Sequence, residues 1–379
     1  MTFRIIAPSA AALLIALGAS AQAAPTASSS VFATGGSVGG TQPDSVTMGD
    51  GSVWIEYGNG ADSTGASGSS TIVQYSPGGA VQHTYSIPGL VDGLKFNPVT
   101  GKVWALQNND GNATLSLINP STGVITGPLQ FASPPYVYGA NSARGYDDVA
   151  FLNGKVYISY TNPVNPSDSV LQILNQGNTP SGTLTTTSIL TAQQTNPLFT
   201  NSTQNPPDID SLKSTPKGQL VLTSEGDGLG PQWATSDGRF TLISNPGTPQ
   251  QSLTNVPVTK SSGVNVNKLD DVLFPGAAAG TLYVTDTGAN KVYAIGLTGL
   301  SPDTPIASLG SFDEVALVDP VTGSVGMALL TGLASTHGLA FTVPEPSTGT
   351  LLLLGFVGLA TTRALRRKAR AASWLAVAN

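Results

Sequence analysis

Between residues 24 and 343, the sequence alternates short apolar runs with turn-forming residues. The runs carry apolar side chains at alternate positions and are separated by glycine, proline and asparagine. This pattern predicts β-strands joined by tight turns. No uninterrupted amphipathic helical pattern longer than two turns occurs between residues 31 and 343. We therefore expect an all-β domain.

One strand pattern recurs and divides this domain into similar units. It is an acidic opener followed by apolar and aromatic positions, as in Leu269–Phe274, and its copies open at Asp44, Asp92, Asp148, Asp210, Asp271 and His337. Each unit has room for about four strands, with the segment 280–285 as the second strand of the unit that Asp271 opens. Four-stranded units that repeat radially predict a β-propeller, here with about six blades and five to seven allowed. A pair of β-sandwiches is the alternative, but it does not explain the recurring opener.

Both ends of the chain differ from this domain. Residues 1–23 have a basic Arg4, an apolar run and the small residues Ala21 and Ala23 around a cleavage position, which predicts a secretory signal peptide. Residues 344–370 contain Pro344, Glu345 and Pro346, then an apolar stretch at 351–360. A basic cluster follows, made of Arg363, Arg366, Arg367, Lys368 and Arg370. Because basic residues stop translocation on the cytoplasmic side, we expect a single, short transmembrane helix.

This C-terminal arrangement resembles the PEP-CTERM sorting segment of Gram-negative bacteria. The resemblance rests on Pro344-Glu345-Pro346, the short apolar stretch and the basic cluster, and the nine further residues 371–379 are a departure from it. It implies processing by an exosortase in a species that makes exopolysaccharide, after a signal peptidase has acted at the N-terminus. The implied destination is the cell surface or extracellular matrix, after transient anchoring in the inner membrane.

Two phrases in the repeated domain resemble known propellers. Residues 282–292 are similar to a blade of the NHL and gluconolactonase-like propellers. Residues 117–123 and 317–323 resemble the strand-Asp-Pro-x-Thr-Gly turn of quinoprotein-like and YncE-like propellers. These resemblances imply the architecture and no particular activity.

Composition excludes several functions. The chain has 379 residues, only 10% of them charged, and a net charge of -6. A nucleic-acid partner is not expected, because phosphate binding requires a basic surface. The chain contains no cysteine, so disulfides, thiol catalysis and cysteine-bound zinc are excluded.

The acidic openers are the main candidates for chemistry. In a closed propeller, residues at the start of the innermost strands approach one another at one mouth of the channel. Asp44, Asp92, Asp148, Asp210 and Asp271, with His337 completing the ring, would form a group of carboxylates that attracts a hard cation such as Ca²⁺. The alternative is that each aspartate caps a turn by accepting backbone N–H bonds.

Other motifs favour structural roles. The loop 224–228 is acidic and glycine-rich, but it has too few oxygen ligands for a calcium loop. The two histidines, His83 and His337, are far apart in the chain, and no Gly-x-Ser-x-Gly motif accompanies them. Trp54 and Trp104 have strand positions typical of packing between blades, and stacking on sugars is the alternative.

These observations leave three classes of function open. The sequence favours a non-catalytic surface or matrix protein that binds polysaccharide or a surface protein, with no catalytic residue assigned. The alternative is a gluconolactonase-like hydrolase or a lyase with a divalent cation in the central channel. The third class is a structural spacer.

Overall fold

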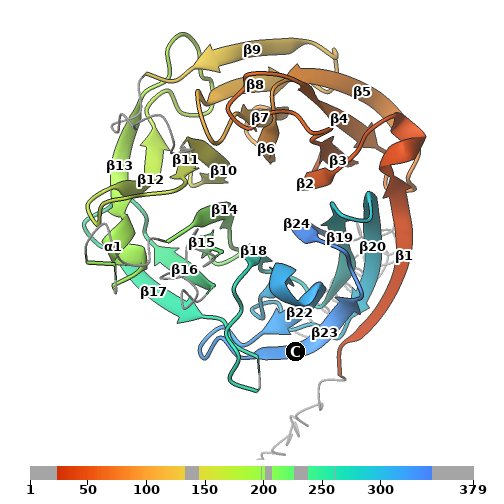
Figure 1. Cartoon of the computed structure of the whole chain (residues 1–379), viewed down its shortest axis with the longest axis vertical. Helices are drawn as coiled ribbons and strands as arrows, with labels where there is room; N and C mark the ends of the chain where they lie inside the picture. Colours follow the sequence, from red (N-terminus) through yellow and green to blue (C-terminus); the bar gives the residue numbers. More distant parts are fainter. Residues whose placement is uncertain are drawn as a thin grey trace, which may run out of the picture.

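The structure is a computed structural model that describes residues 24–132, 145–197, 199–200, 207–225, 238–260 and 262–343. These residues form six antiparallel sheets of four strands each, arranged around a central channel (Figure 1). The prediction of an all-β propeller with six blades is confirmed. Each of the six openers begins the innermost strand of one blade.

Blades 1 to 4 follow the chain, and their strands run from the channel outwards in sequence order. Blade 1 contains β2 (Pro43–Gly49), β3 (Ser52–Tyr57), β4 (Ser69–Tyr75) and β5 (Val81–Pro88). Blade 2 contains β6 (Val91–Asn97), β7 (Lys102–Gln107), β8 (Thr114–Ile118) and β9 (Ile125–Gln130). Blade 3 contains β10 (Tyr146–Leu152), β11 (Lys155–Tyr160), β12 (Ser169–Leu174) and β13 (Thr186–Thr191). Blade 4 contains β14 (Ile209–Ser214), β15 (Leu220–Ser224), β16 (Arg239–Ser244) and β17 (Ser252–Pro257).

Blades 5 and 6 exchange a hairpin. Blade 5 contains β18 (Leu269–Leu273), β21 (Ile306–Leu309), β22 (Glu314–Val318) and β23 (Val325–Thr331). Blade 6 contains β24 (Thr336–Thr342), β19 (Ala279–Asp286), β20 (Lys291–Thr298) and β1 (Thr26–Thr34). The expectation that 280–285 pairs with the strand opened by Asp271 is therefore wrong, because β19 pairs with β24 instead. The pairing partner of β19 depends on a tertiary contact between segments about fifty residues apart, and local strand patterns do not reveal such a contact.

Blade 6 also closes the ring. Its outermost strand β1 comes from the N-terminal side of the chain, and its innermost strand β24 comes from the C-terminal side. Pairing of β1 with β20 joins the first described strand to the last blade. The two ends of the propeller domain are therefore held together in one blade by backbone hydrogen bonds.

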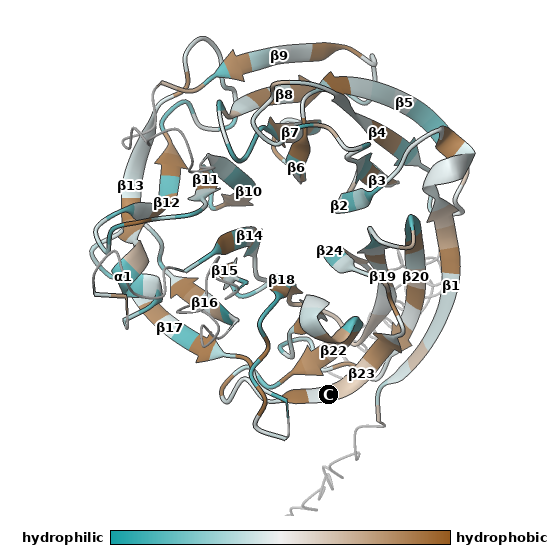
Figure 2. Ribbon diagram, viewed as in Figure 1, coloured by the Kyte–Doolittle hydropathy of each residue, from teal (hydrophilic) through white to brown (hydrophobic). Residues whose placement is uncertain are grey.

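Apolar side chains fill the spaces between neighbouring blades, and Figure 2 shows apolar positions recurring along strands all round the ring. Trp54 of blade 1 packs with Val91 and Leu94 of blade 2, and Trp104 of blade 2 packs with Val149 of blade 3. Both tryptophans are fully buried. They are therefore packing residues and do not form a sugar-stacking surface.

Helical structure is limited to short segments in the part that the structure describes, namely α1 (Ala192–Thr195), η1 (Gly35–Val38) and η2 (Gly310–Phe312). In this part, no helix has the length and apolar character needed to cross a membrane. The expected signal peptide and the expected C-terminal helix fall outside the described residues.

Candidate functional site

The six innermost strands carry their first channel-facing residues in one register. Each of these residues stands two positions before a buried apolar residue, as Asp44 does before Val46. The six equivalent residues are Asp44, Asp92, Asp147, Asp210, Asp270 and His337. Pairing with the second strand is irregular here in every blade. Such bulges change the direction of side chains, and here they place the acidic group at the channel mouth.

Hydroxyl groups on the second strands connect neighbouring openers. The Ser159 hydroxyl donates to the backbone carbonyl of Asp210 at 3.5 Å, and the Thr223 hydroxyl donates to that of Asp270 at 3.0 Å. Across the closing junction, the Thr285 hydroxyl donates to the backbone carbonyl of Asp44 at 2.6 Å. These bonds hold the acidic strands of adjacent blades together. The acidic ring is thus positioned by the packing of blades and not by any single loop.

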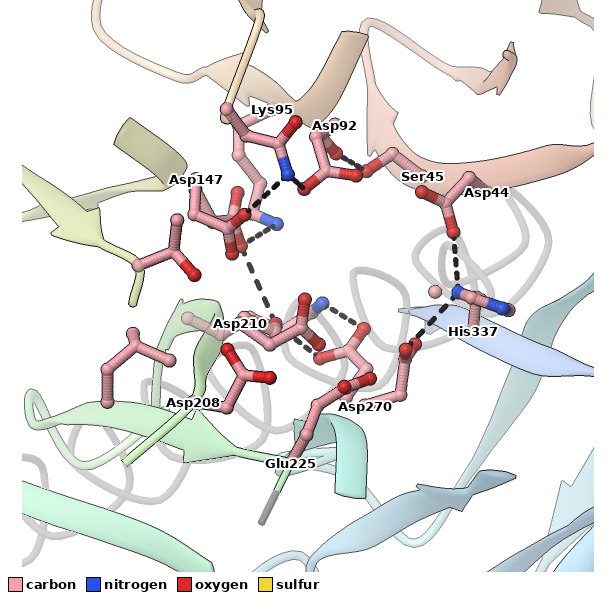
Figure 3. A pocket seen from close by; sticks show the side chains of 18 of the residues that line it. Asp44, Ser45, Asp92, Lys95, Asp147, Asp208, Asp210, Glu225, Asp270 and His337 are labelled. Carbon is pink, nitrogen blue, oxygen red and sulfur yellow. Dashed lines mark hydrogen bonds and ion pairs between the residues drawn. The ribbon is translucent and has the colours of Figure 1, made fainter. Parts of the chain in front are cut away.

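The openers surround an acidic cavity of about 280 Å³ at one mouth of the channel (Figure 3). Besides the six equivalent residues, Asp208 and Glu225 of blade 4 line this cavity. Glu225 comes directly after β15. The cavity thus collects carboxylates from five blades, together with the imidazole of His337.

Two groups of three carboxylates have a spacing suited to a metal ion. Ligand oxygens of Asp92, Asp147 and Asp210 all lie within 4.8 Å of one another, and so do those of Asp210, Glu225 and Asp270. Two ligands on opposite sides of one Ca²⁺ ion are at most about 5 Å apart, since Ca–O distances are 2.3–2.6 Å. Asp210 belongs to both groups. Asn109 donates from Nδ2 to Asp92 at 3.1 Å and to Asp147 at 3.2 Å, which keeps these two carboxylates together.

Burial and mutual repulsion act on this cluster. Burial, followed by the charge of Asp270 and Asp147, raises the pKa of Asp210 well above its ordinary value. Burial and the charge of Asp92 do the same to the pKa of Asp147. Burial and the charge of Asp44 raise the pKa of Asp92. A cation in the cavity would reverse these shifts, because it favours the ionised form of each carboxyl group.

Asp148 and Asp271, which the sequence placed among the candidate ligands, occupy the next position of the opener. The Lys95 ammonium lies 2.8 Å from Asp148, and the backbone N–H of Leu212 in the next blade also donates to this carboxylate at 2.8 Å. Asp271 forms an ion pair with Lys213 and accepts the backbone N–H of Leu339 at 2.7 Å. Both carboxylates are therefore compensated by a lysine and tie adjacent blades together. They line the cavity without belonging to either group of three.

His337 is held between two carboxylates at the closing junction. Its Nδ1 lies 2.9 Å from Asp44 and 3.2 Å from Asp270, and its Nε2 lies 3.0 Å from the Ser335 hydroxyl. Burial lowers the pKa of His337, but the charges of Asp270 and Asp44 outweigh burial and raise it well above 6.5. For Asp44 the two effects have the opposite signs: burial raises its pKa, but the charge of His337 outweighs burial and brings the pKa below the ordinary value. The two carboxylates therefore favour the protonated imidazole, whose positive charge neutralises part of the ring.

All five aspartates that the sequence placed at one mouth line this cavity, namely Asp44, Asp92, Asp148, Asp210 and Asp271. Sequence reasoning missed Asp147, Asp270 and Glu225. The sequence does mark Asp147 and Asp270, because each stands two residues before an apolar residue of the opener, as Asp92 does before Leu94. No such signal marks Glu225, because its acidic, glycine-rich sequence context favours an ordinary loop. His83 lies exposed on the outer strand β5, far from the channel in its blade.

Comparison with known proteins identifies the C-terminal segment. Residues 342–368 match the PEP-CTERM protein-sorting motif, as expected from Pro344-Glu345-Pro346 and the basic cluster. This motif implies export, membrane-anchored sorting to the cell surface and processing by an exosortase. No curated protein sequence matches the chain.

Solved structures show a similar fold at low identity. A structural-genomics target named as a gluconolactonase has 16% identity and a TM-score of 0.47, over 84% of this chain and 86% of that chain. A streptogramin B lyase has 11% identity and a TM-score of 0.43, over 83% of this chain and 91% of that chain. Hydrazine synthase of Kuenenia stuttgartiensis has 8% identity and a TM-score of 0.41, over 73% of this chain and 64% of that chain. Similarities at this level carry no information about activity.

Proposed function

We propose that this protein is a non-catalytic cell-surface propeller that binds a divalent cation in its acidic cavity. The observation that carries the proposal is the spacing of Asp92, Asp147, Asp210, Glu225 and Asp270, whose ligand oxygens form two overlapping groups within 4.8 Å. Without a counter-charge these carboxylates repel one another, and all five are buried or half-buried. A bound cation would turn this repulsion into attraction.

Calcium is the ion that best fits the donor set. The candidate ligands are all carboxylates, which are hard oxygen donors, and the one imidazole in the cavity is already held by Asp44 and Asp270. Zinc prefers nitrogen and sulfur ligands, whereas Ca²⁺ takes six to eight oxygens in flexible geometry. Magnesium needs a tighter octahedron with shorter distances.

The ligand that this cation would hold is an anionic or hydroxyl-rich polysaccharide. Coordination positions that the protein leaves open would accept carboxylate or hydroxyl oxygens of a sugar chain. The sorting motif supports this partner, since it implies an exported surface protein. We extend the proposal to the exopolysaccharide or extracellular matrix of a Gram-negative cell.

Cation binding is tested directly with calcium titration calorimetry and with terbium luminescence on the purified chain. Asp210→Asn removes the carboxylate common to both groups and should abolish saturable binding. Asp50→Asn is the matched control, because Asp50 is exposed in the turn between β2 and β3 and has a positive φ of 51° that asparagine also tolerates. Equal binding by the two variants would exclude the cavity as the cation site.

The polysaccharide step has its own test. The wild-type chain is passed over immobilised exopolysaccharide from a Gram-negative species in the presence of Ca²⁺ or of a chelator. Retention should require Ca²⁺ and should be lost in Asp210→Asn. Retention that is unchanged by chelation would contradict a cation-mediated contact, even if the cation itself binds.

A hydrolase is the second candidate, and one observation favours it. Ser335, His337 and Asp44 are linked in the order of a nucleophile, a base and an orienting acid, at 3.0 and 2.9 Å. However, a general base must be neutral, and the second carboxylate, that of Asp270, favours the protonated imidazole. A serine-directed fluorophosphonate should therefore leave Ser335 unlabelled at pH 7. Labelling that His337→Gln abolishes would favour the hydrolase.

A further inference from the structure

A second cavity, of about 340 Å³, lies at the opposite mouth of the channel. Its walls carry the last apolar residue of five openers, Met48, Phe96, Phe151, Phe274 and Phe341, all half-buried. We call this group the aromatic mouth. Lys95 and Lys213 line both cavities and separate the aromatic mouth from the acidic one.

The chain leaves the propeller at the aromatic mouth. The last strand, β24, runs from His337 in the acidic cavity to Phe341 in the aromatic mouth, and the described structure ends at Val343. Only eight more residues lead to Leu351, where the apolar stretch of the sorting segment begins. Eight residues span at most about 28 Å even when fully extended. The attachment point is thus central on one face, and its tether is short.

We infer that the aromatic mouth faces the lipid bilayer while the protein is anchored, and that the acidic cavity faces away from it. A lipid surface is favoured by the tether, because the sorting motif implies a membrane-anchored stage and the bilayer must then begin within the length of those eight residues. The inference rests on the anchored segment and does not depend on a cation in the acidic cavity.

The rim of the aromatic mouth has the chemistry that suits lipid headgroups. Val99, in the turn between β6 and β7, is 66% exposed, and Val343 is 51% exposed. Lys102 and Lys155 begin the second strands beside this mouth, opposite the ends of β6 and β10. Asp50 is the acidic residue in the corresponding turn of blade 1. Apolar groups flanked by lysines bind an anionic interface, whereas the acidic mouth would be repelled by it.

The absence of cysteine allows a direct test on the full chain. It is reconstituted in vesicles of phosphatidylcholine and phosphatidylglycerol, with a single cysteine carrying an environment-sensitive fluorophore. Val99→Cys reports on the aromatic mouth. Ala66→Cys is the matched control, since it lies exposed in the loop 58–68, which contacts Asp110 of the acidic cavity through Ser63. Nitroxide-labelled lipid is then added as the quencher.

The label at position 99 should be quenched several-fold more than the label at position 66. Lys155→Glu in the Val99→Cys background should reduce that quenching, because it places a negative charge beside the anionic surface. Equal quenching at both positions, or stronger quenching at position 66, overturns the orientation. Two results together would show that a second copy covers the aromatic mouth instead. These are disulfide-linked dimers of the unlabelled Val99→Cys protein and no lipid quenching of the labelled protein. Loss of Ca²⁺ binding in Asp210→Asn would leave all of these results unchanged.

Discussion

Replacing Asp210 by asparagine should change the stability of the propeller in opposite directions with and without calcium. The pKa values of Asp92, Asp147, Asp210 and Asp270 are all raised in the folded protein. The folded state then binds more protons than the unfolded chain at pH values between the ordinary and the raised pKa. In a chelator, the contribution of these four groups to stability is therefore greatest below about pH 4 and decreases as the pH rises through the raised values. Asp210→Asn removes one member of the cluster and should make this fall smaller.

Calcium should restore the stability that the wild-type protein loses at neutral pH. At a free Ca²⁺ concentration one hundred times the dissociation constant, binding adds about 2.7 kcal/mol. Unfolding of the roughly 320 residues from 24 to 343, at about 2.1 cal/mol/K per residue, converts this into a rise in Tm of about 4 °C. The rise should be smaller at pH 5, because carboxyl groups must lose protons to bind the ion.

The assay is thermal unfolding followed by circular dichroism at pH 5 and pH 7, with Ca²⁺ or a chelator. In the chelator at pH 7, Asp210→Asn should melt at a higher temperature than the wild-type protein. With Ca²⁺ this order should reverse, while Asp50→Asn should follow the wild-type protein throughout. A variant that responds to Ca²⁺ like the wild-type protein, or a wild-type Tm that chelation leaves unchanged, would refute the shared site.

Three further predictions concern the bonds that assemble the ring. Asp271→Asn breaks the buried pair with Lys213 and should lower the free energy of unfolding by about 3–5 kcal/mol in urea, whether or not Ca²⁺ is present; a loss confined to the calcium form would contradict this. The raised pKa of His337 means that its contribution is complete below pH 6.5 and disappears as the pH rises through the raised value. His337→Gln should therefore destabilise the protein more at pH 6 than at pH 10, and a pH-independent loss would count against the ion pairs. Thr223→Val removes the bond to the Asp270 carbonyl and should lower the free energy of unfolding by about 1 kcal/mol in the same assay; an unchanged midpoint would show that the bond is not needed.

Local sequence patterns were sufficient to predict the propeller architecture and the sorting of this protein to the cell surface. Alternating apolar positions and glycine-rich turns identify strands, and six similar openers imply six blades, because each signal lies within one short segment. The sorting segment was readable for the same reason: Pro344-Glu345-Pro346, an apolar stretch and a basic cluster follow one another directly. The start of the innermost strand could be assigned to one mouth, with Asp44, Asp92, Asp148, Asp210 and Asp271, because similar positions in a radial repeat converge.

Only the tertiary structure decided which groups meet. The hairpin of β19 and β20 belongs to blade 6 because it pairs with β24, a segment that follows it by about fifty residues. In blades 3 and 5 the bulge separates two adjacent aspartates, so that Asp147 enters the cluster while Asp148 turns to Lys95 and to the next blade. Glu225 reaches the cavity from the end of a second strand, which no repeat pattern marks. Such assignments depend on the direction of side chains and on contacts between distant segments, and neither is encoded in local periodicity.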